Sequence, residues 1–178
     1  MPAAIPVELW PHSPDWAVAA EEAAKRLHSV LGANVLVVHH IGSTSIPGIC
    51  AKPIVDLMPV VSSVRWFDEQ TALLLSLGFR SWGEYGIEGR RYCTLEDGAT
   101  GKRKFQLHAF EVDHPAIERH LAFRDYLRAH PEVALAYDAE KRRCQALYPR
   151  DSHAYTDAKS GWIASQLEAA VAYWKSPK

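Results

Sequence analysis

Small and hydroxyl-bearing residues form a loop at residues 42–48, which reads Gly-Ser-Thr-Ser-Ile-Pro-Gly. Glycine lets a backbone approach a ligand closely, and successive N–H groups in a tight turn can hold an anion. Gly42, Ser43 and Thr44 are therefore candidates for phosphate binding, and the hydroxyl groups of Ser43, Thr44 and Ser45 are additional donors. The loop lacks the Gly-Lys-Ser/Thr ending of a Walker loop, so a P-loop is not predicted. The alternative is an ordinary connection between two strands, because Gly and Ser are common in loops.

One acid follows this loop inside an apolar run. The two-residue period of a strand places Asp56 on the same face as Ile54 and Met58. Burial of an unpaired carboxylate costs on the order of several kcal/mol, so this side chain needs a partner. We expect Asp56 to act as a catalytic residue and as a ligand of a metal or substrate. A structural ion pair with Arg91 or Lys159 is the alternative.

Two histidines are further candidates for chemistry. His108 shares one face of a predicted strand with Gln106 and Phe110, where it could serve as a general base or a metal ligand. The alternative is a hydrogen-bonded core histidine. His40 precedes the loop and is a candidate for substrate binding, although a hydrogen bond to the loop backbone would explain it as well. His39 points to the opposite face of the same strand.

Two lysines are candidates for neutralising phosphate charge. Lys52 stands shortly before the acid, and its alternative is a solvated loop lysine. Lys159 shares a helical stripe with Tyr155 and Trp162, so it needs an acid, an aromatic face or a bound anion. An internal salt bridge would also satisfy it. The basic run at residues 141–143 is expected to be a solvated helix face.

The elements that must position these residues follow from periodicity and from Gly and Pro signals. We expect a helix from Pro14 to about Leu31, a second at 64–77, and three more after His114, divided by Pro131 and Pro149. Strands are expected at 35–38, 54–61, 79–82, 90–95 and 103–112, the last two joined by a turn at 97–101. The sequence therefore predicts one α+β domain over residues 1–178, with a mixed sheet followed by a helical tail.

Composition narrows the classes of protein that the chain could belong to. The net charge is −1, so no global field draws it to nucleic acid or to a membrane surface. Its 3 cysteines are widely spaced and include no Cys-x-x-Cys pair, which favours a reducing compartment over a disulfide scaffold. We see no signal peptide and no apolar run long enough to span a membrane, and we expect a cytoplasmic protein.

The spacing from Gly42-Ser43 to Asp56 resembles the motif of the polymerase-β-like nucleotidyltransferase superfamily. In that superfamily Gly-Ser holds a triphosphate, and a later strand carries Asp-x-Asp for two magnesium ions. Asp56 stands where the second aspartate would be, and Ile54 replaces the first. The resemblance implies a bound Mg²⁺ and a third ligand on the neighbouring strand, where this chain has His108.

A longer stretch, from His40 to Leu57, resembles the signature of the GrpB family (UPF0157), whose members have a nucleotidyltransferase-like fold. Further matches stand at residues 89–92, 103, 107–108, 121–131, 155 and 159, so the resemblance covers nearly the whole chain. Gln106 stands where the pattern has another histidine. Arg90 and Arg91 point to opposite faces of their strand, and the resemblance favours Arg91 for the site. Domains of this type also follow dephospho-CoA kinases in longer chains.

Two hypotheses about function stay open. In the first, the chain is a nucleotidyl or phosphoryl transferase for a small phosphorylated substrate, with Asp56 binding magnesium and Lys52, Arg91 and Lys159 neutralising charge. In the second, it is a non-catalytic module that binds a nucleotide or a phosphorylated metabolite, or that assists a protein partner in cofactor synthesis. A single acid among several cations suits the second hypothesis, because it can bind an anion without two metals.

Overall fold

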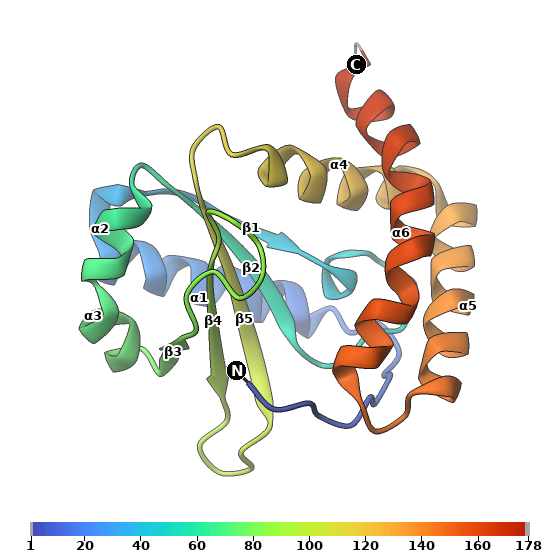
Figure 1. Ribbon diagram of the computed structural model, residues 1–178, viewed down its shortest axis with the longest axis horizontal. Helices are drawn as coiled ribbons and strands as arrows, with labels where there is room; N and C mark the ends of the chain where they lie inside the picture. Colours follow the sequence, from blue (N-terminus) through green and yellow to red (C-terminus); the bar gives the residue numbers. More distant parts are fainter. Residues whose placement is uncertain (1, 177–178) are drawn as a thin grey trace.

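A computed structural model describes residues 2–176 and contains one five-stranded mixed sheet (Figure 1). The strands are β1 (Val35–Ile41), β2 (Val55–Val61), β3 (Phe79–Ser81), β4 (Arg91–Glu96) and β5 (Arg103–Glu111). Their order across the sheet is β1-β2-β5-β4-β3. Only the β2–β5 pair is parallel in this sheet, whereas β1–β2, β4–β5 and β3–β4 are antiparallel.

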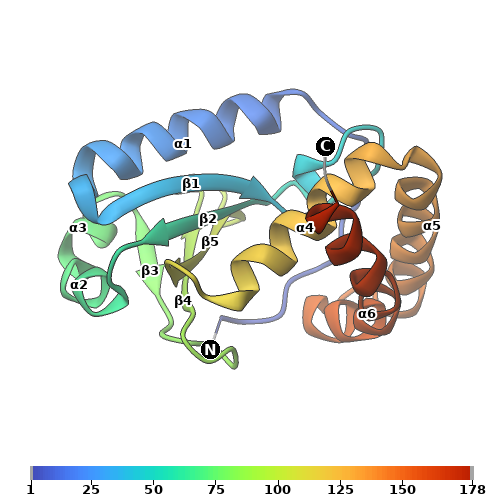
Figure 2. The same cartoon turned by 90° about the horizontal axis from the view of Figure 1, so that it is seen from above.

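Helices cover the sheet in two groups (Figure 2). The first group packs on one face and comprises α1 (Asp15–Leu31), α2 (Val64–Glu69) and α3 (Thr71–Ser76). The second group forms the C-terminal part and comprises α4 (Pro115–Ala129), α5 (Pro131–Leu147) and α6 (Ser152–Lys175). Two short 3-10 turns, η1 (Gly32–Asn34) and η2 (Ser43–Ser45), flank β1. The predicted α+β fold, with a mixed sheet and a helical tail, is confirmed.

Strand alternation gives the two sheet faces different chemistry. Leu57 and Leu107 lie opposite each other in the β2–β5 register and are fully buried against the α1–α3 layer. Their neighbours Asp56 and Gln106, also paired in that register, therefore lie on the other face. Further along that face, Phe110 packs with Leu121 of α4. On this face, the polar side chains of Asp56 and Gln106 therefore lie next to an apolar cluster that includes Phe110.

The expected boundaries are confirmed for most elements and wrong for two. The strand expected at 35–38 continues to Ile41, so His39 and His40 lie within β1. The first helix ends at Leu31 and is followed by Gly32, whose φ of 65° stops it. The single helix expected at 64–77 is instead two helices, because the backbone leaves helical geometry at Gln70. There the Thr71 hydroxyl donates to the Asp68 carbonyl at 2.7 Å, a local bond that competes with a continuous helix.

The C-terminal region follows the predicted division into three helices. Pro131 is the first residue of α5, and the Asp151 carboxylate caps α6 by accepting from the His153 and Ala154 N–H groups. Within residues 2–176, no helix is both long enough and apolar enough to cross a membrane.

Candidate functional site

The centre of the site is a contact between two strands. His108 Nε2 on β5 lies 3.2 Å from Asp56 Oδ1 on β2. Because Asp56 pairs with Gln106 in the parallel register, His108 is two residues further along the same face. The side chain of Asp56 is 25% exposed and that of His108 is 15% exposed, so both can be reached from solvent. The partner of Asp56 is therefore His108, and neither Arg91 nor Lys159 forms the ion pair considered above.

Surrounding positive charge favours an ionised Asp56. Burial opposes ionisation, but the hydrogen bond from His108 and the charges of His108, Lys52 and Lys159 outweigh it and lower the pKa of the Asp56 carboxyl. An ionised carboxylate can accept a proton or coordinate a cation. It cannot serve as a proton donor at neutral pH.

Gly42 holds the loop directly against this carboxylate. Gly42 has a φ of 70°, and its neighbour Ile41 pairs with Asp56 in the β1–β2 register. A Cβ at position 42 would overlap Asp56 Oδ2 and lie 3.1 Å from both Cβ and Cγ of Asp56. The close approach and the positive φ each require glycine. The structure therefore brings the loop and the acid together, as the resemblance implied.

The three loop hydroxyls are not equivalent. Thr44 is buried and its Oγ1 lies 2.9 Å from His40 Nε2, while the buried Ser45 hydroxyl donates to the Gly42 carbonyl at 2.6 Å. Among the described residues, the half-buried Ser43 hydroxyl has no hydrogen-bond partner. Ser43 is thus the hydroxyl that remains available to a ligand, whereas Thr44 shapes the loop.

His40 supports the loop from the opposite side of the sheet. In the β1–β2 register it lies opposite Leu57, a core residue on the α1 face. Burial lowers the pKa of His40 to about 4, so the ring is neutral at physiological pH. Its carbonyl accepts a bond from Arg124 Nη1 at 3.2 Å. This placement agrees with the expected contact between His40 and the loop. It does not agree with the expected binding of substrate by His40, because Asp56 lies on the other face of the sheet.

Arg90, rather than Arg91, is the arginine that the structure brings to the site. Arg91 pairs with Ala109 on the α1 face, and its guanidinium binds both oxygens of Asp68 at 2.6 and 2.8 Å. The preference for Arg91 is therefore corrected. Arg90 is buried, and its Nη1 lies 3.5 Å from His108 Nδ1. Strand alternation separates the two arginines, but their sequence does not say which one faces the acid.

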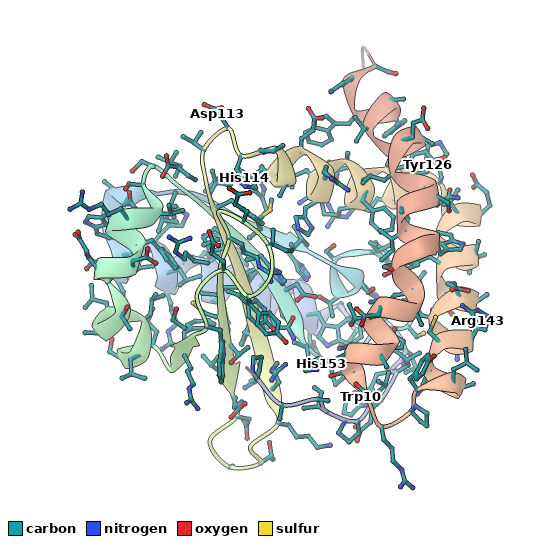
Figure 3. All side chains as sticks on the ribbon, viewed as in Figure 1. Trp10, Asp113, His114, Tyr126, Arg143 and His153 are labelled. Atoms are coloured by element: carbon teal, nitrogen blue, oxygen red, sulfur yellow. The ribbon has the colours of Figure 1, made fainter. Side chains whose placement is uncertain are left out.

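Arg90 also anchors the loop at residues 83–90. Its Nε donates to the Glu84 carbonyl at 3.1 Å and its Nη2 donates to the Tyr85 carbonyl. Two histidines contact the same loop from the helical side (Figure 3): His114 Nε2 lies 3.2 Å from the Glu88 carbonyl, and His153 Nε2 lies 3.3 Å from the Tyr85 hydroxyl. The loop thus links the sheet to the starts of α4 and α6.

Two predicted lysines meet at one aromatic ring. Lys159 Nζ lies 4.8 Å and Lys52 Nζ lies 5.6 Å from the centre of the Tyr155 ring. Lys159 therefore contacts an aromatic face, one of the three partners that its position on the helix predicted. Burial and the nearby charge of Lys159 lower the pKa of Lys52 to about 8, with a further contribution from Arg103. Arg103 stands at a position of the family resemblance, but that resemblance assigned it no role at the site.

The basic run at 141–143 is only partly a solvated face. Lys141 is 1% exposed, so that expectation is wrong for its first residue. Lys141 Nζ donates to the Cys50 carbonyl, and the Asp138 carboxylate accepts the Cys50 N–H at 2.6 Å. Helix α5 thereby fixes the chain between the loop and Asp56. Arg142 and Arg143 are exposed, as expected.

A cavity of about 850 Å³ opens beside Gly42. Gly42 and His120 form its wall, and Asp56 and His108 lie directly behind them, with the His108 and His120 rings 6.0 Å apart. Arg119 and Arg124 contribute positive charge to the lining. Much of the apolar lining comes from α4, α5 and α6, including Phe123, Tyr137, Ile163 and Leu167, and Ile46 and Ile87 add to it from loops.

The residues present do not form a complete protein site for a metal ion. Within residues 2–176, no group of three or more His, Cys, Asp and Glu side chains could hold one. Ile54 is buried at the position of the first superfamily aspartate, and His108 stands on the neighbouring strand. Asp56 alone suits a Mg²⁺ ion that takes its remaining ligands from phosphate oxygens and water.

Comparison with known proteins finds sequence relatives and more distant proteins of similar fold. The UPF0157 protein YqkA of Bacillus subtilis is 42% identical over 172 residues, which cover 95% of this chain and 48% of that relative. This chain therefore spans about half the length of that relative. A dephospho-CoA kinase of Mycolicibacterium paratuberculosis is 27% identical over 187 residues, which cover 93% of this chain and 46% of the kinase.

Solved structures support the same assignment. The GrpB protein of Enterococcus faecalis superposes with a TM-score of 0.87 at 34% identity, over 94% of this chain and 100% of that one. The Cid1 poly(U) polymerase superposes with a TM-score of 0.54 at 13% identity, over 83% of this chain and 49% of that one, which supports a nucleotidyltransferase-like fold. The GrpB protein family model matches residues 6–169. This chain therefore belongs to the GrpB family.

Proposed function

We propose that the chain binds a nucleotide or a similar small phosphorylated ligand in the cavity beside Gly42. The observation that carries this proposal is the contact between Gly42 and Asp56 at the wall of a cavity of about 850 Å³. Small-molecule sites commonly have volumes of about 300–1,000 Å³ with apolar walls and a few convergent polar groups. The polar groups that line this cavity include His114, Arg119 and His120, and Gly42 holds the backbone of its wall against Asp56.

The cavity has two ends that suit the two parts of a nucleotide. The phosphates would lie at Gly42, next to Ser43 in the chain. Arg124 already pairs with Asp125 at 2.7 Å, so Arg119 in the same lining would balance their charge. A base or another apolar group would lie against Phe123 and Tyr137, whose rings meet edge to face at 5.6 Å. The description of the Cid1 structure names bound magnesium and 3′-dATP, a ligand of this class.

A magnesium ion fits this proposal only as part of the ligand complex. Asp56 would supply one carboxylate, and the phosphates would supply other oxygens. When bound, the ion would screen the repulsion between phosphate and the ionised Asp56. His108 would keep Asp56 oriented through their 3.2 Å contact.

Transfer of a nucleotidyl or phosphoryl group is the second candidate function. It is favoured by the Asp56–His108 pair, since an ionised carboxylate held by a histidine can accept the proton of an attacking hydroxyl. The alternative is a non-catalytic module. The single carboxylate and the similarity to part of a dephospho-CoA kinase favour that alternative.

Calorimetry with ATP, UTP and CTP, each with MgCl₂ or with EDTA, tests the proposal. We expect micromolar binding of at least one nucleotide, weakened about tenfold or more by Ser43→Ala and by Asp56→Asn. Ser160→Ala and Asp157→Asn on exposed positions of α6 are the matched controls. Absence of binding to the wild type under both conditions overturns the proposal. Binding that survives EDTA argues for the non-catalytic module, and nucleotide turnover argues for transfer.

A further inference from the structure

A second cavity, of about 520 Å³, lies beside the N-terminal segment. Trp10, labelled in Figure 3, lines it together with Lys52 and Arg103. Lys102 and Lys104 also line it, but each already has an acid: Lys102 pairs with Glu8 at 3.3 Å, and Lys104 approaches Asp97 at 3.9 Å. The wall of this cavity therefore contains cations of two kinds, paired and unpaired. It also contains Glu96, which lies opposite Arg103 in the β4–β5 register.

The unpaired cations are Lys52 and Arg103, with Lys159 adjacent to Lys52 at the Tyr155 ring. In the part of the chain that the structure describes, none of these three forms an ion pair with a carboxylate. Arg103 Nε is buried and has no hydrogen-bond partner there. The charge of Asp56 offsets part of the repulsion between Lys52 and Lys159. It leaves the buried Nε of Arg103 without an acceptor, which is costly, so this arrangement favours a further anion.

We propose that Lys52, Lys159 and Arg103 form a second anion-binding subsite, which takes the phosphate group of a small phosphorylated molecule at the inner end of the 520 Å³ cavity. The nucleotide cavity includes Gly42, which contacts Asp56, whereas the second cavity includes Lys52, whose charge also acts on Asp56. Each anionic group would thus be held by its own cations. The inference rests on the proposed function only where it speaks of a nucleotide in the first cavity. Phosphate binding to the second subsite can be measured without a nucleotide.

Phosphate is favoured over a carboxylate by the donors present. The guanidinium of Arg103 and two ammonium groups offer donors that match the several oxygens of a tetrahedral dianion. The cavity is large enough for a small organic group attached to that phosphate. Inorganic phosphate and glycerol 3-phosphate are therefore suitable probes, and they distinguish a site for the free ion from a site for an ester. Sodium acetate serves as the carboxylate probe.

The test is calorimetry of these probes on the full chain, with and without saturating ATP. We expect glycerol 3-phosphate to bind at least threefold more tightly than inorganic phosphate, and acetate not to bind. Arg103→Gln and Lys159→Met should weaken phosphate binding tenfold or more, Arg103→Lys should weaken it less, and Lys102→Gln should change it less than twofold. Thermal unfolding of each variant verifies that it is folded.

Two results would overturn the second subsite. One is equal weakening by Lys102→Gln and Arg103→Gln, which would indicate general attraction to positive charge. The other is complete competition between ATP and glycerol 3-phosphate, which would indicate a single site. Phosphate binding that depends on Arg103 in a protein that does not bind ATP would instead support this subsite while rejecting the nucleotide proposal.

Discussion

Alternate residues of the same strands give the two faces of the sheet different roles: one face forms the core, and the other carries the candidate site. On the α1 side, Leu57 and Leu107 are fully buried in an apolar cluster. On the other side, their neighbours Asp56 and His108 are paired with each other and remain partly exposed. Fold stability and ligand binding should therefore be separable one residue at a time.

The largest expected effect compares Leu107 with His108. Leu107→Ala removes a buried side chain from the core and should lower the free energy of unfolding by about 3 kcal/mol, with ATP affinity retained. His108→Ala should lower it by about 1 kcal/mol but weaken ATP binding about tenfold, because Asp56 loses its partner. Urea unfolding and calorimetry measure both quantities. A loss of affinity in the folded Leu107→Ala protein would break the separation.

The next effect tests the contact between the loop and the acid. Gly42→Ala should cost about 2–3 kcal/mol, since it adds a clash with Asp56 to the strain of a positive φ. Gly48→Ala is the matched control: its φ is 79° but its Cβ would meet open space, so it should cost about 1 kcal/mol. Chemical denaturation gives both values. Equal losses would show that the Asp56 contact does not constrain the loop.

Acid should destabilise both sides of the sheet through two half-buried histidines. Burial lowers the pKa of His40 and of His120 to about 4, from an ordinary value of 6.5. The unfolded chain therefore binds protons first as the pH falls. The stabilisation is complete above pH 6.5 and is lost as the pH falls towards 4, at most about 3 kcal/mol for each histidine. The double variant His40→Gln/His120→Gln should flatten the melting-temperature profile over this range, whereas His28→Gln, on an exposed position, should leave it unchanged.

The smallest effect separates two adjacent arginines. Arg90→Gln should weaken ATP binding about tenfold, because the 83–90 loop and His108 lose their common anchor. Arg91→Gln should change affinity less than twofold and should cost about 0.5–1 kcal/mol of stability through loss of its pair with Asp68. Affinity measured on both folded variants decides this point. A larger loss of affinity in Arg91→Gln than in Arg90→Gln would show that Arg91 belongs to the site.

The sequence predicts the scaffold better than it predicts the site. Strand and helix positions follow from hydrophobic period and from Gly and Pro signals, which are local properties. The split at Gln70 is not predictable in this way, because no Gly or Pro marks it in the sequence. The choice between Arg90 and Arg91 needs the β4–β5 register, which places Tyr92 opposite His108 and Arg91 opposite Ala109.

The sequence also does not predict which lysines and arginines lie close together. Lys52 precedes β2 and Lys159 lies in α6, and only the tertiary fold brings them to the same tyrosine ring. Arg103 stands out only once its Nε is seen to be buried without a partner. Lys141 looked like a surface residue because two exposed arginines follow it, and its burial depends on the backbone at Cys50.

The one parallel strand pair links assembly of the site to the last stages of folding. Asp56 and His108 are 52 residues apart in the sequence, and two helices and two strands lie between β2 and β5. Closing so long a segment costs chain entropy before the pairing repays it, so contacts of this kind form slowly. A growing chain that has not yet added β5 would have the Gly42 loop and the acid but not the histidine that holds the acid. Ligand affinity should thus appear only when the whole sheet has formed.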